Sequence, residues 1–202
     1  DEAVGYSDPE RGVDIHIMPS DQFRVTFMLD YESKTLGTQF TTMDELEKNF
    51  ATEIAPARTF CFLSEVEHLK EQGLVKGGNI DNAVVIVDKT IDENEAETLS
   101  KLFGIDKKIS LGSNGTLGGT EFRFDNEPVR HKALDLIGDL ALLGMPLQGH
   151  VIASKSGHAA NVELVKEIKK VYKKKINKQT YSAQPSTKTM FDINSIIRLL
   201  PH

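Results

Sequence analysis

Apolar and polar residues alternate along much of the first part of the chain. Phe23, Val25, Phe27 and Leu29 are separated by residues such as Thr26, which is the period of a β-strand with one buried face. Shorter patterns of the same kind, and short buried runs, predict further strands. The strands expected are residues 13–19, 23–30, 37–42, 82–87 and 149–155.

Stretches with apolar residues at helical spacing lie between these strands. Thr42 has Glu45 three residues later, the spacing of a capping box, and predicts a helix from Met43 to Ile54. The glycine-rich segment 112–120 predicts a turn at the tip of a hairpin. Strands in runs, broken by helices without a regular βαβ repeat, favour an α+β fold with a mostly antiparallel sheet. The other helices expected are residues 64–72, 93–103, 127–143 and 158–174.

Length, charge and cysteine content limit the class of protein. The 202 residues suit one domain and a fragment of a second, and the net charge of -6 argues against a general nucleic-acid binder. Cys61 is the lone cysteine, which excludes a disulfide framework and a thiolate metal cluster. The apolar runs are shorter than the roughly 18 residues of a membrane span, and the acidic start is unlike a signal peptide. We therefore expect a cytoplasmic protein without a membrane span.

The last part of the chain differs in composition from the rest. Lysines are concentrated between Lys166 and Lys178, which fits a solvated helix end better than a membrane or nucleic-acid patch, because no aromatic residues interleave. Residues 176–189 have the polar composition of a linker after a domain at 1–175. Apolar residues at helical spacing return at 190–202, which we interpret as the truncated start of a second domain. The acidic start without Met suggests a piece of a longer protein.

The helix expected at 127–143 is apolar around most of its circumference, with one narrow charged stripe. His131 and Asp135 are four residues apart, so they project side by side, as two ligands of one zinc ion must. Lys132 and Asp139 belong to the same stripe. Because the wide apolar arc predicts a buried helix, its charges must be paired or bind a metal. An ordinary surface stripe is the alternative, and the spacing alone does not decide between them.

His158 follows Lys155-Ser156-Gly157, where a strand is expected to lead into a helix. One interpretation is that His158 simply occupies the start of the helix and has no catalytic role. A helix N-terminus disfavours a charged imidazole, so a catalytic histidine at this position would need a carboxylate partner. Asp139 is the candidate partner.

Three segments, in order, carry a resemblance to a known family. They are Ala57-Arg58-Thr59-Phe60 with Glu67-His68-Leu69-Lys70-Glu71-Gln72-Gly73-Leu74, then Val129-Arg130-His131-Lys132 with Asp135 and Asp139, then Lys155-Ser156-Gly157-His158 with Asn161. Together they resemble the second half of the zinc-dependent UDP-3-O-acyl-N-acetylglucosamine deacetylase. The resemblance implies a two-layer α+β sandwich with helices packed on one face of the sheet, plus an inserted strand-helix unit. It also implies an active site between two such domains.

By this resemblance, the whole protein hydrolyses the N-acetyl group of UDP-3-O-acyl-N-acetylglucosamine in lipid A biosynthesis and releases acetate. His131 and Asp135 are then two of three protein ligands of Zn2+. The third ligand and a glutamate base belong to a missing first domain that docks on the site face. The resemblance makes His158 the general acid or electrostatic partner, oriented by Asp139, and makes Thr59 a stabiliser of the oxyanion. This chain alone is then expected to be an inactive half-site.

The resemblance also assigns contacts with the UDP-sugar lipid substrate. Phe60 packs on the sugar, and Lys132 meets the nucleotide phosphates. Residues 73–87 correspond to a unit that forms an acyl-chain passage. Two features depart from the family pattern: Cys61 stands where glycine is common, and residues 88–124 are longer than the usual connection. The candidate wall residues of the passage are Val66, Val75, Ile80 and Val85.

Residues 190–202 resemble the opening of a 3-hydroxyacyl-acyl-carrier-protein dehydratase, which implies a bifunctional fusion whose second enzyme has acyl carrier protein as a partner. Two alternatives stay open. One is a non-enzymatic acyl-chain or partner-binding module on the same fold, against which the intact set of His131, Asp135 and His158 argues. The other is an unrelated metal-binding protein in which the charged stripe is structural.

Overall fold

The computed structural model describes residues 2–31, 33, 35–73, 82–103 and 115–179. These residues divide into two compact units. Unit 1 takes the described residues of 1–30, 38–56 and 129–202, and unit 2 takes those of 31–37 and 57–128. Each unit is considered by itself.

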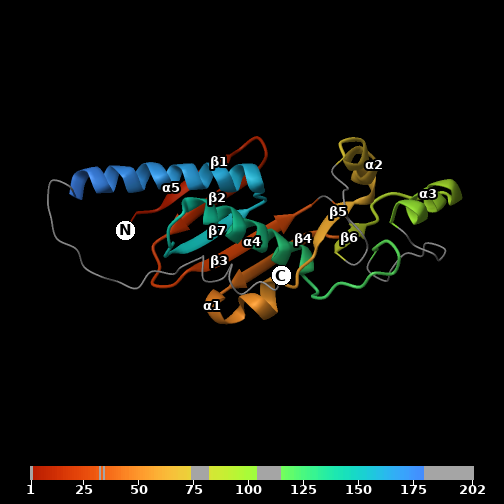
Figure 1. The fold of residues 1–202 in the computed structure, drawn as a ribbon, viewed down its shortest axis with the longest axis horizontal. Coiled ribbons are helices and arrows are strands. Elements are labelled where there is room, and N and C mark those ends of the chain that lie inside the picture. Colours follow the sequence, from red (N-terminus) through yellow and green to blue (C-terminus); the bar gives the residue numbers. More distant parts are fainter. Residues whose placement is uncertain (1, 32, 34, 74–81, 104–114, 180–202) are drawn as a thin grey trace. The chain divides into compact units, whose positions relative to one another are not determined.

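Unit 1 is built on a five-stranded sheet with the strand order β1-β2-β7-β3-β4 (Figure 1). Strands β3 and β7 are parallel, and the other neighbouring pairs are antiparallel, so the predicted mostly antiparallel sheet is confirmed. The first strand was not predicted from the sequence, whereas the other four lie where the alternation placed them. The strands are β1 (Val4–Asp8), β2 (Val13–Met18), β3 (Arg24–Asp30), β4 (Thr38–Met43) and β7 (His150–Ser154).

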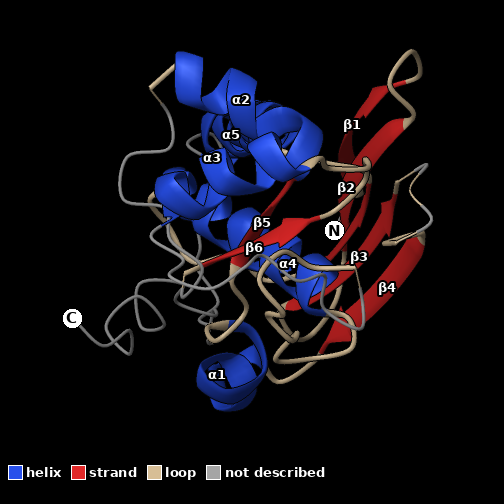
Figure 2. Cartoon of the chain, turned by 90° about the vertical axis from the view of Figure 1, so that its right-hand side faces the viewer, coloured by secondary structure: helices blue, strands red, loops and turns tan. Residues whose placement is uncertain are grey.

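Two helices, α4 (Glu127–Leu140) and α5 (His158–Gln179), lie on the same side of this sheet (Figures 1 and 2). On β3, Val25, Phe27 and Leu29 are each at most 3% exposed, so the predicted alternation separates a buried face from an outer face. The apolar arc of α4 is buried as expected, and the two-layer sandwich is confirmed. The buried residues of α4 include Val129, Ala133, Leu136, Ile137 and Leu140.

The segment after β4 differs from the prediction. Thr42 does not cap a helix, because it lies within β4, with its hydroxyl 3.1 Å from the hydroxyl of Thr26 on β3. Met43 is buried in the core and pairs with Val25, which keeps the chain extended through this residue. The helix α1 therefore begins later and is shorter (Leu46–Asn49), and a π-helix (Phe50–Ile54) continues it.

Unit 2 contains a two-stranded parallel sheet and two helices, which confirms the expected inserted strand-helix unit. Its elements are β5 (Thr59–Phe62), α2 (Leu63–Glu71), β6 (Ala83–Ile86) and α3 (Glu93–Phe103). Strand β5 was not predicted, because four residues are too few to show a period. One of its core clusters is formed by Leu63, Val66, Val85, Leu99 and Leu117.

The glycine-rich segment expected at a hairpin tip is described only from Gly115 onward. Thr116 forms an isolated antiparallel bridge with Ile86, and the N–H of Leu117 donates to the carbonyl of Val85 at 2.9 Å. Thr116 and Leu117 thus run beside β6 and are not the tip of a hairpin. The expected turn is present at Gly118 and Gly119, where the N–H of Thr120 donates to the carbonyl of Leu117 at 3.5 Å. Residues 112–114 lie outside the described residues.

Helix α5 ends at Gln179, five residues beyond the expected end at Lys174. The first four residues of the segment expected to be a linker, 176–189, are therefore helical. The remainder of that segment and the expected second-domain start at 190–202 lie outside the described residues. Among the helices that the structure describes, none is long and apolar enough to cross a membrane.

Two glycines of the α4 region should respond in opposite ways to alanine. Gly144 follows the last turn with φ 71, a conformation that costs an L-residue energy, so we expect Gly144→Ala to lower the free energy of unfolding by about 1 kcal/mol. A Cβ on Gly138, within α4, meets no other atom within 4 Å, so Gly138→Ala should raise this free energy by up to about 1 kcal/mol. Urea unfolding of the chain measures both, and a shift of the same sign in the two variants would contradict the argument.

Candidate active site

The charged stripe of α4 forms a compact cluster in unit 1. His131 Nε2 lies 3.4 Å from Asp135 Oδ1, and the two side chains are only 17% and 19% exposed. Lys132 Nζ lies 3.8 Å from the other oxygen of Asp135. The i, i+4 spacing thus places the imidazole and the carboxylate side by side, as expected.

His158 extends this cluster from the first turn of α5. Its Nδ1 lies 2.8 Å from Asp139 Oδ2, and its Nε2 lies 3.9 Å from Asp135 Oδ2. Because a carboxylate can only accept, Nδ1–H is the donor, and Nε2 is the ring nitrogen that can release or take up a proton. The ring itself is 68% exposed, so Nε2 is accessible to a reacting group.

Two further residues hold the carboxylate of Asp139, and the sequence analysis assigned neither of them a role. Asn161 donates from Nδ2 to Asp139 Oδ2 at 2.8 Å, and Ser156 Oγ donates to Asn161 Oδ1 at 2.9 Å. Asn161 is 1% exposed and Ser156 is 4% exposed. A buried, satisfied amide of this kind fixes the carboxylate that faces His158. Both residues belong to the Lys155–Asn161 segment, so their place in the family motif was the available signal.

The sharp entry into α5 also depends on backbone conformation. Lys155 has φ 51, and its N–H donates to the carbonyl of Met28 on β3 at 2.9 Å. Lys155 Nζ forms an ion pair with Asp30 at 2.7 Å. These contacts anchor the end of β7, from which the chain turns through Gly157 to His158.

The other predicted site residues lie in unit 2. Thr59 begins β5 and is exposed, and it pairs with Ala83 of β6. Phe60 is half-buried, packs against a cluster that includes Val84, and makes an edge-to-face contact with Tyr31 at 5.9 Å between ring centroids. The expectation that Thr59 and Phe60 share a face with the His131 cluster stays a prediction.

The predicted acyl passage is partly outside the described residues, which exclude Val75 and Ile80. Val66 and Val85 are each 2% exposed and pack in the same core cluster of unit 2. A separate hollow of about 520 Å³ in this unit is lined by hydroxyl, acidic and aromatic residues, including Tyr31, Phe62 and Asp88. The wall assignment of Val66 and Val85 therefore stays a prediction.

Cys61, which stands where the family pattern has glycine, is not activated as a nucleophile. Burial, with smaller contributions from the nearby carboxylates of Glu65 and Asp88, raises the pKa of its thiol to about 11. A thiol with this pKa stays protonated at neutral pH, which is typical of a packing residue.

The donor set in the described part of the chain is suited to a shared metal site. No group of three or more His, Cys, Asp or Glu side chains that could hold a metal lies within the described residues. His131 and Asp135 supply one nitrogen and one oxygen, donor types that zinc accepts, and they are close enough to reach one ion. This pair fits a zinc ion that takes its remaining protein ligand from elsewhere.

Comparison with known proteins defines the family. A model of the LpxC family, UDP-3-O-acyl N-acetylglycosamine deacetylase, matches residues 4–101 and 90–170. The chain therefore belongs to the LpxC family.

Individual relatives extend the match to the ends of the chain. A "Bifunctional enzyme LpxC/FabZ" from Chlorobaculum tepidum is 49% identical over 203 residues, which cover 100% of this chain and 44% of the relative. The protein of the same name from Porphyromonas gingivalis is 38% identical, over 97% of this chain and 42% of the relative. A "UDP-3-O-acyl-N-acetylglucosamine deacetylase" from Leptospira biflexa is 41% identical, over 74% and 41%. The chain thus spans less than half the length of these relatives.

Proposed function

We propose that this chain is the second half of the deacetylase part of a bifunctional enzyme, and that the whole protein hydrolyses the N-acetyl group of UDP-3-O-acyl-N-acetylglucosamine in lipid A biosynthesis. The products are acetate and the free amine. The cluster of His131, Asp135, Asp139 and His158 carries the proposal, because it combines a candidate metal pair with a candidate acid–base histidine. Family membership supports it.

In this proposal, His131 and Asp135 hold Zn2+ together with one histidine of a preceding domain. When bound, the ion supplies Lewis-acid polarisation of the amide carbonyl and activation of water. The side chains of His131 and Asp135 are partly buried beside each other, so little ordering is needed when the ion binds.

His158 is the general acid for the leaving amine. Its Nδ1–H is fixed by Asp139, so Nε2 of the charged ring carries the proton to be donated. Asp139 and Asp135 balance the charge of the imidazolium. Asn161 keeps the Asp139 carboxylate aimed at the ring, which makes it a positioning residue.

Lys132 and the predicted site residues of unit 2 are proposed to contact the substrate. Thr59 donates its hydroxyl hydrogen to the developing oxyanion, the kind of electrostatic stabilisation that contributes most to acyl-transfer catalysis. Phe60 packs on the sugar ring, and the ammonium of Lys132 binds the phosphates. Val66, Val75, Ile80 and Val85 line the path of the acyl chain, where each buried methylene contributes about 0.8 kcal/mol.

The rest of the enzyme supplies what this chain lacks for turnover. The preceding domain docks on the face that carries His131 and His158, and brings the third zinc ligand and a glutamate base. The segment 190–202 leads into a 3-hydroxyacyl-acyl-carrier-protein dehydratase, whose partner is acyl carrier protein. Relatives more than twice as long, two of them named as bifunctional, support this arrangement.

Zinc titration of this chain and of the full-length protein tests the proposal. We expect the full-length protein to bind one zinc ion and to release acetate from the substrate. The chain alone should bind zinc at least about a hundredfold more weakly, because one of three ligands is missing, and should show no turnover. A full-length protein that binds the acylated nucleotide sugar without hydrolysing it would instead favour a non-enzymatic binding module. Turnover by the chain alone would disprove the division of the site.

A further inference from the structure

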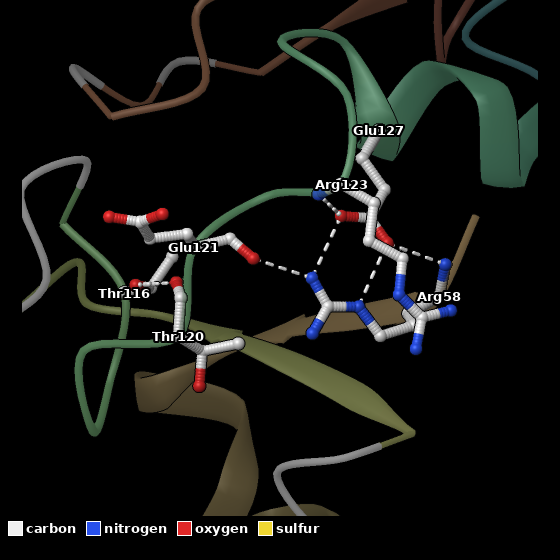
Figure 3. Close-up of polar contacts among 6 residues, drawn as sticks. All are labelled: Arg58, Thr116, Thr120, Glu121, Arg123 and Glu127. Atoms are coloured by element: carbon white, nitrogen blue, oxygen red, sulfur yellow. Dashed lines mark hydrogen bonds and ion pairs between the residues drawn. The ribbon is translucent and has the colours of Figure 1, made fainter. Parts of the chain in front are cut away.

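A buried ion pair in unit 2 joins the residue before β5 to the first residue of α4 (Figure 3). Arg58 Nε donates to Glu127 Oε1 at 2.9 Å, and Arg58 Nη2 donates to Glu127 Oε2 at 3.0 Å. The side chains of Arg58 and Glu127 are only 9% and 1% exposed. This two-pronged geometry is the strongest that an arginine and a carboxylate can form.

The carboxylate of Glu127 also fixes the backbone on both sides of it. The N–H of Arg58 donates to Glu127 Oε1 at 2.8 Å, and the N–H of Arg123 donates to Oε2 at 2.7 Å. A third side-chain bond runs from Arg58 Nη2 to the carbonyl of Glu121 at 2.7 Å (Figure 3). Each oxygen of Glu127 thus accepts two hydrogen bonds, and Glu127 binds the peptide nitrogen of Arg58 as well as its guanidinium.

Two residues near this pair in the sequence have roles in the proposed function. Thr59 follows Arg58 directly, and His131 follows Glu127 by four residues, about one turn of the same helix. Thr59 is the first residue of β5, which in the part of the chain that the structure describes pairs with β6 in a two-stranded sheet, and such a sheet by itself holds a strand end weakly. The bond from the N–H of Arg58 to Glu127 fixes the backbone immediately before Thr59.

We propose that Arg58 and Glu127 are positioning residues for deacetylation, and that they hold the hydroxyl of Thr59 where the oxyanion develops. This inference rests on the proposed function, which gives Thr59 its role. A group that stabilises a transition state must be held to within a few tenths of an ångström, because a displacement of about 1 Å can cost about a hundredfold in rate. Neither residue needs to touch the substrate for this effect.

Glu127→Gln in the full-length, zinc-loaded protein is the direct test. The amide has one acceptor oxygen in place of two, and its own donors face groups that also donate, so it cannot keep all the bonds from the guanidinium and from the N–H groups of Arg58 and Arg123. The backbone before Thr59 is then held less firmly. We expect kcat to fall by about 10- to 100-fold, with KM changed less than about threefold and bound zinc unchanged. Arg58→Lys keeps the charge but loses the planar fork, and should lower kcat in the same way by a smaller factor.

Glu53→Gln is the matched control. Glu53 forms an ion pair with Arg130 of α4 at 2.6 Å, so it also anchors this helix, and its backbone carbonyl, which accepts a second bond from Arg130, survives the change. We expect kcat and KM of this variant to match the wild type within about twofold, since the pair is partly exposed. An equal fall of kcat in Glu53→Gln and Glu127→Gln would overturn the inference, because anchoring α4 would then explain both.

A double-mutant cycle with Thr59→Val separates positioning from general damage. If Glu127 acts through the hydroxyl of Thr59, Glu127→Gln should change kcat by less than about twofold when that hydroxyl is already absent. If Thr59→Val is impaired and Glu127→Gln lowers kcat by the same factor with and without the Thr59 hydroxyl, the positioning role is overturned. The proposed function would remain intact. Full activity of Thr59→Val would overturn the proposed role of Thr59 and the positioning inference with it.

Discussion

His131→Ala in the full-length protein should lose its bound zinc and with it about a thousandfold or more of its deacetylation rate. Structural zinc sites bind with roughly 10–16 kcal/mol, so the removal of one of three protein ligands costs several kcal/mol, or two to three orders of magnitude in affinity. The carboxylate of Asp135, 3.4 Å from the imidazole, would not replace the lost nitrogen, because in the proposed site it already serves as a ligand. Metal content after dialysis and initial rates with added zinc measure the two effects separately.

His16→Ala is the matched control for this variant. His16 lies on β2, is 37% exposed and pairs with Asp14 at 3.1 Å, so it is also a histidine beside an aspartate. It belongs to the sheet and not to the α4 stripe, and we expect its loss to leave zinc content and rate unchanged. A His131→Ala protein that keeps a full zinc ion would remove the metal assignment. Retained zinc with lost activity would instead make His131 a catalytic group.

Most of the sheet and the helices could be predicted because burial sets a period along the sequence. Strand β3 alternates and α4 has a wide apolar arc, and both patterns follow directly from one buried face. Strand β1 alternates half-buried residues such as Val4 and Tyr6 with the exposed Gly5 and Ser7, but it has no fully buried residue and is short, so its pattern is weak. Thr42 matched a capping box, but pairing of β4 with β3 outweighed that local signal, since Met43 gains more from burial than a cap provides.

The contacts of the candidate site likewise divide into those that a local sequence pattern predicts and those that it does not. The pairs His131–Asp135 and Asp139–His158 could be predicted because helical spacing and one strand-to-helix junction bring them together. The Arg58–Glu127 pair could not, because its members are 69 residues apart and no local pattern links them. Their contact depends on how unit 2 packs, which apolar periodicity does not specify.

Glu127→Ala should lower the free energy of unfolding by about 3–5 kcal/mol, which is the usual cost of leaving one member of a buried ion pair unpaired. Arg58 would keep its charge at 9% exposure without a carboxylate, and two backbone N–H groups would lose their acceptor. The double variant Arg58→Met, Glu127→Leu should recover the part of the loss that comes from the unpaired charge, because it removes the charge along with its partner, whereas the two N–H groups still lack the carboxylate. Urea unfolding of the wild type, the single variant and the double variant measures this, and equal stability of the two variants would contradict it.

The pH dependence of this loss follows from the pKa of Glu127. Burial alone would raise this pKa, but the hydrogen bonds from the Arg58 side chain and from the N–H groups of Arg58 and Arg123 outweigh it, so the pKa in the folded protein is lowered. A lowered pKa contributes stability that is complete above the unfolded value of about 4.3 and is lost as the pH falls through the folded value. The difference in unfolding free energy between the wild type and Glu127→Ala should therefore be constant from pH 6 to 8 and shrink below about pH 4. A difference that grows on acidification would show that Glu127 is not the ionised partner of Arg58.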